Sequence, residues 1–225
     1  MTYREQATAL PFATLWRQHS GPAPKPTLIL PDGCLDLIWD GQRLFVAGPD
    51  TRAQRHHSPP NTEYVGLRFA AGLGPALLGV PADELRDQQI ALADLGSPEA
   101  ARILTEQVAD DPVAGLTNWL TGQPRPDPLG PRMMTMASAG WSVEAMADRV
   151  GLSARQLHRR CLPLFGYGPR HLARVLRLNR ALEQVREQRP LAQVAAEAGY
   201  CDQAHLSREV RDLVGTTPTR WLAGR

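Results

Sequence analysis

The sequence contains little cysteine and no long apolar run. Its three cysteines, Cys34, Cys161 and Cys201, are far apart, and none belongs to a Cys-x-x-Cys pair. An odd number of scattered cysteines argues against a disulfide framework and against a zinc finger. No apolar stretch approaches the roughly 18 residues of a membrane-spanning helix, and residues 1–12 lack the apolar core of a secretory signal. We therefore expect a cytoplasmic protein with no membrane partner.

Lysine is also nearly absent, since Lys25 is the single lysine among 25 basic residues and the others are arginine. The charges are distributed unevenly. Residues 1–129 contain 10 basic and 15 acidic side chains, whereas residues 130–225 contain 15 arginines and 8 acidic side chains. The second part therefore carries a balance of +7, which predicts a separate domain that faces a polyanion. The alternatives are a chance imbalance of surface charge and an arginine content set by genome composition.

Proline divides the chain. Residues 121–132, TGQPRPDPLGPR, contain four prolines and two glycines, and such a segment is predicted to hold neither a helix nor a central strand. We expect an α+β fold. A small β-rich domain, cupin-like or a meander, with helices at its end is predicted over residues 1–120, followed by a linker over 121–131 and an all-α domain over 132–225.

Short strand-like runs precede residue 70, separated by turn clusters such as PDG, DGQ and SPPN. They are Thr27–Leu30, Cys34–Trp39, Leu44–Ala47 and Thr62–Phe69. Residues 28–48 are predicted to form an antiparallel meander. Helical periodicity then begins, with short helices over 74–88, a longer helix capped by Ser97, and a last short helix over 112–122.

Two segments of the C-terminal part, residues 143–160 and 191–209, repeat one pattern at an offset of 48 to 49 residues. Each begins with a short helix that ends at a glycine, Gly151 or Gly199, because the position after a helix favours a left-handed backbone. The similarity continues through a second glycine and a proline. The repeated unit therefore contains three helices.

The second helix of each unit is predicted to follow a capping side chain, Ser153 or Asp202, and to bury one leucine, Leu157 or Leu206. This pattern is typical of the helix-turn-helix motif, whose second helix enters the major groove of DNA. Arginine and glutamine side chains can form hydrogen bonds with base edges in that groove. The alternative to DNA recognition is that these residues only form a solvated helix face. The outward residues are Arg155, Gln156, His158 and Arg159 in the first unit and Gln203, Ala204, Ser207 and Arg208 in the second.

Residues 170–188 are predicted to form the helix that sets the spacing of the two units. Two rigidly joined motifs would reach successive major-groove segments about 34 Å apart. Phosphate contacts are expected from Arg160, Arg174 and Arg177.

Residues 130–225 resemble the AraC/XylS-type DNA-binding domain. The stretch AAEAGYCDQAHLSREVRDLVGTTPTRW contains A-x-x-x-G-[FY], a Leu-Ser-Arg step and G-x-[ST]-P-x-x-[YW]. The resemblance implies a transcription regulator, not an enzyme, whose two second helices read double-stranded DNA. The implied base contacts are Arg155, His158, Arg159, Gln203, Ser207 and Arg208. Val210 and Cys161 replace the family's usual aromatic residues, which implies a less filled core, and Pro163 is predicted to bend the last turn of its helix.

The stretches LPDGCLDLIW and GVPADELRD resemble a small β-rich domain that precedes this DNA-binding domain in some family members. The resemblance implies that the N-terminal domain senses a small-molecule effector, forms a homodimer, or both. The candidate effector-binding residues are Cys34, Asp36, Trp39 and Arg68.

Residue chemistry adds detail to these candidates. Asp36 is predicted to face the sheet interior together with Cys34, where it needs a partner such as Arg43 or Arg68. Trp16 and Trp39 favour core positions over a ligand platform. We expect no cofactor and no metal site, because adjacent histidines in the sequence RHH point to opposite faces of a strand.

Two alternatives stay open. Cys34 is a candidate alkyl-group acceptor or thiol sensor, as in DNA-repair proteins that carry this DNA-binding domain, although an inert packed cysteine is the default. A small cupin-like enzyme with an accessory DNA-binding domain is the third possibility, and it needs a metal or an acid–base pair.

Overall fold

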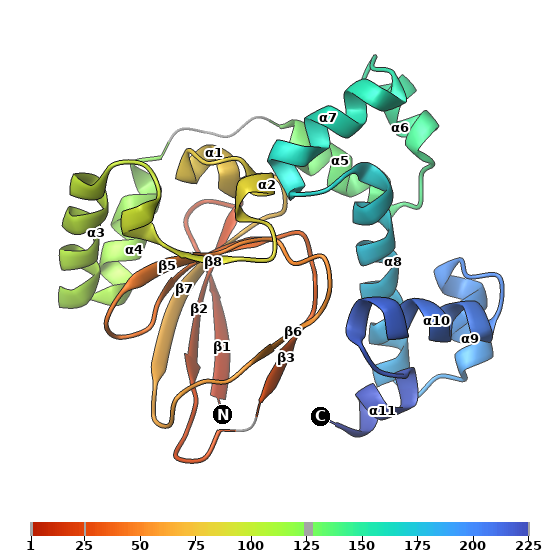
Figure 1. Cartoon of the computed structure of the whole chain (residues 1–225), viewed down its shortest axis with the longest axis horizontal. Coiled ribbons are helices and arrows are strands. Elements are labelled where there is room, and N and C mark those ends of the chain that lie inside the picture. Colours follow the sequence, from red (N-terminus) through yellow and green to blue (C-terminus); the bar gives the residue numbers. More distant parts are fainter. Residues whose placement is uncertain (1, 25, 124–127, 225) are drawn as a thin grey trace.

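Antiparallel strands form the N-terminal part of the chain, as predicted. The computed structural model describes residues 2–24, 26–123 and 128–224. A six-stranded sheet has the order β1-β2-β7-β4-β5-β8, and β3 pairs with β6 in a separate ribbon (Figure 1). The strands are β1 Thr2–Ala7, β2 Ala13–His19, β3 Thr27–Ile29, β4 Leu35–Trp39, β5 Leu44–Ala47, β6 Gln54–His56, β7 Glu63–Phe69 and β8 Gln89–Ala91.

The predicted meander over residues 28–48 is half right. β4 and β5 form the expected hairpin, in which Trp39 lies opposite Leu44. Strand β3 instead leaves the sheet and pairs with β6, where Thr27 lies opposite His56. The chain turns between β3 and β4 at Gly33, whose φ of +80° suits glycine, and β7 takes the place beside β4.

Helices follow β7 up to residue 121, and β8 interrupts them after α2. Ser97 caps α3 by accepting a hydrogen bond from the Ala100 N–H, as predicted, and Ala101, Leu104 and Val108 are buried on one face of that helix. The elements are α1 Gly74–Leu78, α2 Ala82–Leu85, a 3₁₀ turn Leu92–Asp94, α3 Pro98–Asp110 and α4 Pro112–Thr121.

Alternation along the strands gives the sheet two different faces. On one face Leu15, Leu37, Val46 and Leu67 are at most 4% exposed and form one apolar core with α3 and α4. Each fully buried leucine contributes about 1.5–3 kcal/mol to folding. The other face, towards the β3–β6 ribbon, carries the polar side chains described below.

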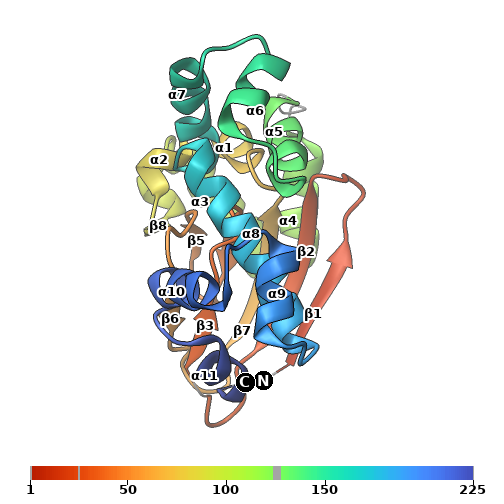
Figure 2. The same cartoon turned by 90° about the vertical axis from the view of Figure 1, so that its right-hand side faces the viewer.

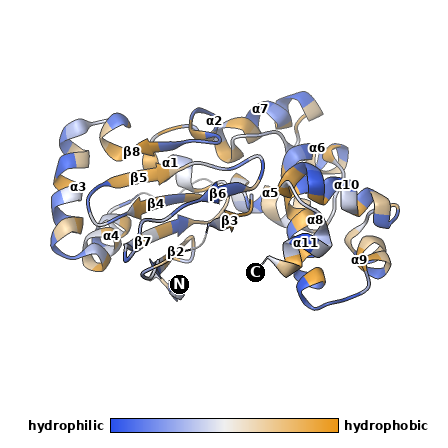
Figure 3. Cartoon of the chain, turned by 60° about the horizontal axis from the view of Figure 1, so that its bottom comes forward, coloured by the Kyte–Doolittle hydropathy of each residue, from blue (hydrophilic) through white to orange (hydrophobic). Residues whose placement is uncertain are grey.

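The remainder of the chain is helical. The helices are α5 Leu129–Ser138, α6 Val143–Arg149, α7 Ala154–Phe165, α8 Pro169–Arg186, α9 Leu191–Ala198, α10 Gln203–Val214 and α11 Pro218–Ala223. Across the described ranges, no helix is long and apolar enough to span a membrane. Figure 3 shows the β3–β6 ribbon between the sheet and this helical part.

The predicted linker over 121–131 is too long at both ends. Helix α4 includes Thr121 and α5 begins at Leu129, whereas residues 124–127 lie outside the described residues. Pro131 is compatible with α5 because it occupies the first turn, where backbone N–H groups have no partner within the helix.

Candidate functional site

The two repeated units turn their corners with the same backbone hydrogen bond. In the first unit the Leu152 N–H donates to the Ala147 carbonyl at 2.9 Å, and in the second the Tyr200 N–H donates to the Ala195 carbonyl at 2.8 Å. The glycine just before each donor has a left-handed backbone, with φ of +70° in one unit and +81° in the other. The predicted corners and their offset of 48 residues are therefore confirmed.

Side-chain caps start both second helices. Ser153 accepts a hydrogen bond from the Gln156 N–H, and the Gln156 side-chain oxygen accepts one from the Ser153 N–H at 2.9 Å. Asp202 accepts the His205 N–H at 2.6 Å. Both predicted caps are confirmed. Gln156 is exposed and its side-chain oxygen closes the capping box, and its contact with DNA stays a prediction.

Buried anchors hold the second helices in place. Leu157 in α7 and Leu206 in α10 have no exposed surface, and the small residues Ala147 and Ala195 beneath them are at most 2% exposed. The smaller residues at the family's aromatic positions are also fully buried. These are Cys161 and Val210.

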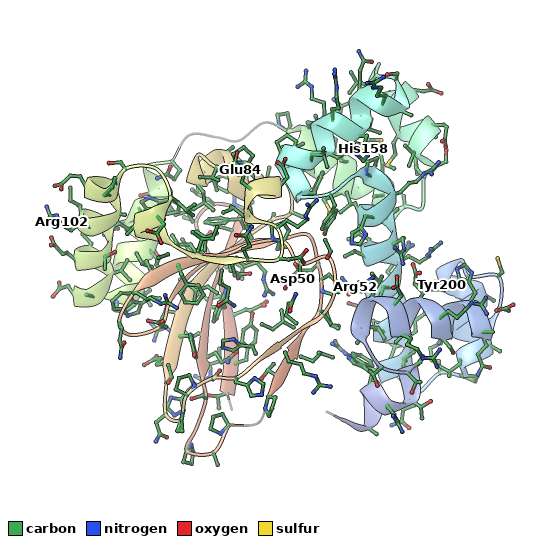
Figure 4. All side chains as sticks on the ribbon, viewed as in Figure 1. Asp50, Arg52, Glu84, Arg102, His158 and Tyr200 are labelled. Atoms are coloured by element: carbon green, nitrogen blue, oxygen red, sulfur yellow. The ribbon has the colours of Figure 1, made fainter. Side chains whose placement is uncertain are left out.

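The opposite faces of the two second helices are open to solvent. Arg155, His158 and Arg159 are exposed on α7, together with Arg160, and Gln203 and Arg208 are exposed on α10, whereas Ser207 is half-buried. Figure 4 shows His158 on α7. Its ring lies against Gly168, where a Cβ atom would come within 2.3 Å of Nδ1, so His158 is also part of the α7–α8 turn.

Helix α8 joins the two units. Its 18 residues correspond to about 27 Å of α-helix. Figure 2 shows α7 and α10 on one side of α8, and α6 and α9 on the other.

Arg174 and Arg177 on α8 bind carboxylates of α10. Arg174 makes a bidentate pair with Glu209, both distances being 3.0 Å, and also contacts Asp212 at 2.6 Å. Arg177 lies 3.5 Å from Glu209 and stacks over the Tyr200 ring at 4.6 Å. Burial by itself would raise the pKa of Glu209, but the hydrogen bonds and charges of the two arginines outweigh it and lower that pKa.

The predicted phosphate contacts of Arg174 and Arg177 stay predictions, and in the structure both side chains are engaged within the chain. Their guanidinium groups attach α10 to α8 within the chain. Arg160 has no such partner among the described residues and stays a candidate phosphate contact.

A second candidate site is the cavity between the sheet and the β3–β6 ribbon. Its volume is about 330 Å³, near the lower end of ligand-binding pockets. Its walls combine aromatic, aliphatic and acidic side chains. They include Tyr3, Trp16, Ile29, Asp32, Cys34, Asp36, Ile38, Phe45, Asp50, Arg55, His56, Tyr64, Arg68 and Asp87.

Asp36 lies at the centre of the polar groups in the cavity. It accepts a hydrogen bond from Trp16 Nε1 at 2.6 Å, and Arg68 Nε lies 3.4 Å from its Oδ1. Burial raises the pKa of Asp36 to about 6, although Arg68 opposes this shift. Arg68, and not Arg43, is therefore the partner of Asp36, since Arg43 pairs with Asp40.

The structure brings Cys34, Asp36 and Arg68 together, but not Trp39. Trp39 is 7% exposed and belongs to the core on the other face of the sheet, as its alternation with Asp36 requires. Trp16 is 7% exposed, as expected for a core residue, and it also forms part of the cavity wall.

Asp50 is one of several cavity residues that sequence reasoning missed. It is half-buried, and burial together with Asp87, Asp32 and Asp36 raises its pKa to about 7. Its only sequence signal was the turn motif GPD, and a turn motif does not indicate which cavity its residues line.

The histidine and cysteine positions also become clear. His56 lines the cavity while His57 is exposed, as expected for neighbours on a strand. Burial, followed by the charges of Asp32 and Asp36, raises the pKa of the Cys34 thiol well above its ordinary value.

Within the described part of the chain, no three His, Cys, Asp or Glu side chains are grouped so that they could hold a metal ion.

Comparisons with known proteins cover both parts of the chain. Residues 146–224 match the family model described as Helix-turn-helix domain, and residues 12–91 match a Domain of unknown function, DUF6597. No curated protein matches the chain significantly.

The solved structures to which this chain is similar include the following three. The DNA-binding domain of AdpA in complex with a target DNA is 24% identical, covers 44% of this chain and 92% of that chain, and has a TM-score of 0.39. The C-terminal domain of AraT, a response regulator from Geobacillus stearothermophilus, is 21% identical over 44% and 87% of the two chains, with a TM-score of 0.41. Apo ToxT K231A from Vibrio cholerae is 11% identical over 98% and 99%, with a TM-score of 0.48.

Proposed function

Residues 146–224 are a helix-turn-helix domain of the AraC type. From this premise we propose that the chain is a DNA-binding transcription regulator, that it recognises a specific DNA sequence, and that a small molecule controls it. The observation that supports sequence-specific binding is the pair of identical corners, each followed by a capped helix with an exposed polar face. The proposed base contacts are Arg155, His158 and Arg159 on α7 and Gln203, Ser207 and Arg208 on α10.

DNA binding is tested by titrating labelled DNA from upstream of the chain's own coding region, or a site selected from a random library, at several salt concentrations. Each phosphate neutralised by the protein contributes about −0.9 to the slope of log K against log salt. We expect a steep negative slope and tighter binding to the selected site than to random DNA. An affinity that does not change with salt would refute the proposal.

Control by a small molecule is supported by the position of the β3–β6 ribbon. Ile29 and Leu30 line the cavity, and Leu28, Leu30 and Ala53 pack against the core of the second helix-turn-helix unit. One thin layer therefore separates the proposed effector site from α10. A ligand that shifts the ribbon would shift the contacts of the second unit with it.

Polar contacts reinforce this connection. The loop after β5 contributes Arg52, which lies 3.3 Å from Asp212 of α10, and the Thr51 carbonyl, which lies 3.1 Å from His171 Nε2 of α8. In Figure 4, Asp50 and Arg52 lie close together where the two parts meet. The same short loop thus lines the cavity and contacts the DNA-binding part.

The proposal keeps the predicted roles of the two domains. Residues 1–120 would sense the effector, form a homodimer, or both, and residues 132–225 would bind DNA. The edge strand β1, whose residues are all exposed, supports the dimer, because an edge strand offers unpaired backbone groups to a second copy. Light scattering on the purified chain tests this part, and a monomer at all concentrations would refute it.

The alternative function for Cys34, alkyl acceptance or thiol sensing, is not favoured. Its raised pKa keeps the sulfur as a thiol at neutral pH, whereas the thiolate is the reactive form. Mass spectrometry after exposure to a methylating agent tests it, and we expect no selective adduct at Cys34.

A further inference from the structure

Acidic groups outnumber basic ones around the cavity. Four aspartates line it, against the two arginines Arg55 and Arg68. Arg68 is already surrounded by carboxylates, since it pairs with Asp36 at 3.4 Å and lies 3.9 Å from both Asp32 and Glu5. A ligand with a carboxylate or phosphate would therefore have to displace these partners to reach the buried arginine.

Asp50 differs from the other acidic groups of the cavity. Asp36 has Trp16 and Arg68 as partners, and Asp87 accepts hydrogen bonds from the backbone and side chain of Thr51. Across the described ranges, Asp50 has no cation within ion-pair distance and its carboxylate accepts no hydrogen bond. It is thus a half-buried carboxylate without a counter-charge, and such a group is costly unless a ligand pairs with it.

Aromatic rings form much of the remaining wall. Trp16 and Tyr3 lie with their centroids 6.0 Å apart, and His56 and Tyr64 meet edge to face at 5.9 Å. Aromatic faces attract organic cations as well as apolar groups. Ile29, Ile38 and Phe45, which also line the cavity, add apolar surface that a hydrated metal ion would not use.

We propose that this cavity binds a small organic cation, an amine or guanidine with an apolar body, whose charge pairs with Asp50 and whose body packs on the aromatic wall. This inference rests on the proposed effector role of the cavity and names its ligand class. Asp36 and Arg68 form the fixed polar floor, and Asp50 supplies the charge that selects the ligand.

Three probes of similar shape and different charge test the proposal. Isothermal titration of the full chain is carried out with 2-phenylethylamine, 2-phenylethanol and phenylacetate, above the pKa of about 7 of Asp50. We expect the amine to bind at least about tenfold more tightly than the alcohol, which corresponds to one close charge pair, and phenylacetate to bind most weakly.

Substitutions assign the effect to Asp50. Asp50→Asn should reduce the affinity for the amine about tenfold and leave the affinity for the alcohol within about twofold. The matched control is Asp83→Asn, an exposed aspartate on α2 that does not line the cavity and should change neither. Thermal unfolding of each variant establishes that it is folded.

Several outcomes would overturn the proposal. They are equal affinity for amine and alcohol, preference for phenylacetate, unchanged amine binding in Asp50→Asn, and no binding by 2-phenylethylamine, benzyltrimethylammonium or agmatine. Salt-dependent DNA binding by the same preparation separates the two questions. If DNA binding persists while every cation fails, only the ligand class is wrong, and if DNA binding is absent, the proposed function fails whatever the cavity binds.

Discussion

Ala53 donates its backbone N–H to the Leu213 carbonyl at 2.7 Å. Leu213 lies in the last turn of α10, where carbonyl groups have no partner within the helix. The chain that leads into β6 therefore completes the hydrogen bonding at the end of α10. A change in the cavity wall has a short, direct route to the proposed DNA contacts.

Arg208 is expected to contribute to base recognition. Arg208→Ala should weaken binding to the specific site by about 1–3 kcal/mol and binding to random DNA only slightly, because a bidentate contact with guanine is lost. Fluorescence anisotropy measures the affinity of the variant for the specific site and for random DNA.

The control for Arg208 is Arg102→Ala, which removes another exposed arginine, this one on α3. Figure 4 shows Arg102 on the side of the molecule away from the helix-turn-helix units. Equal losses on specific and random DNA for Arg208→Ala would mean that this side chain contacts only the phosphate backbone.

Leu28 and Ile29 are adjacent on β3 and face different neighbours. Leu28→Ala should loosen the second unit and increase hydrogen exchange in α9 to α11, at a cost of about 1–2 kcal/mol. Ile29→Ala should instead weaken binding of an amine probe. Both variants are compared by hydrogen exchange, measured by mass spectrometry, and by titration with the amine probe. Identical profiles would show that the ribbon does not separate the two functions.

Arg174 is expected to matter for stability more than for DNA affinity. Arg174→Ala leaves the buried Glu209 with Arg177 alone, and should lower the free energy of unfolding by about 2–3 kcal/mol. Adding Glu209→Gln should recover part of the loss, because the unpaired charge is removed. Urea denaturation measures both. Arg102→Ala, whose ion pairs are exposed, should cost less than about 1 kcal/mol.

Asp50 should make stability depend on pH. Its pKa is raised to about 7 in the folded chain, so between an ordinary value near 3.8 and about 7 the folded state binds a proton that the unfolded state does not. The free energy of unfolding should therefore fall as pH rises through this window, by about 1–2 kcal/mol after allowance for solvent screening. Asp50→Asn should show a smaller decline, because Asp36, whose pKa is raised to about 6, still contributes in the same direction.

The pH profile is measured by urea denaturation from about pH 4 to about pH 8. Asp83→Asn should follow the unsubstituted chain, because this exposed side chain is not in the cavity. Parallel profiles for Asp50→Asn and the unsubstituted chain would contradict the prediction.

Local chemistry was readable from the sequence. The corners at Gly151 and Gly199, the caps Ser153 and Asp202, and the buried Leu157 and Leu206 were all predicted correctly because each depends on residues within a few positions along the chain. The repeat made these signals specific, since one motif occurs twice at nearly constant spacing.

Long-range placement was decided only by the tertiary structure. Alternation in β4 indicated that Asp36 and Trp39 face opposite sides, but not which side encloses a cavity. Two contacts join segments that are distant in sequence: the pairing of β3 with β6, and the ion pair between Arg174 and Glu209. These contacts depend on burial and charge pairing between whole elements, and the sequence around each residue contains no signal for its distant partner.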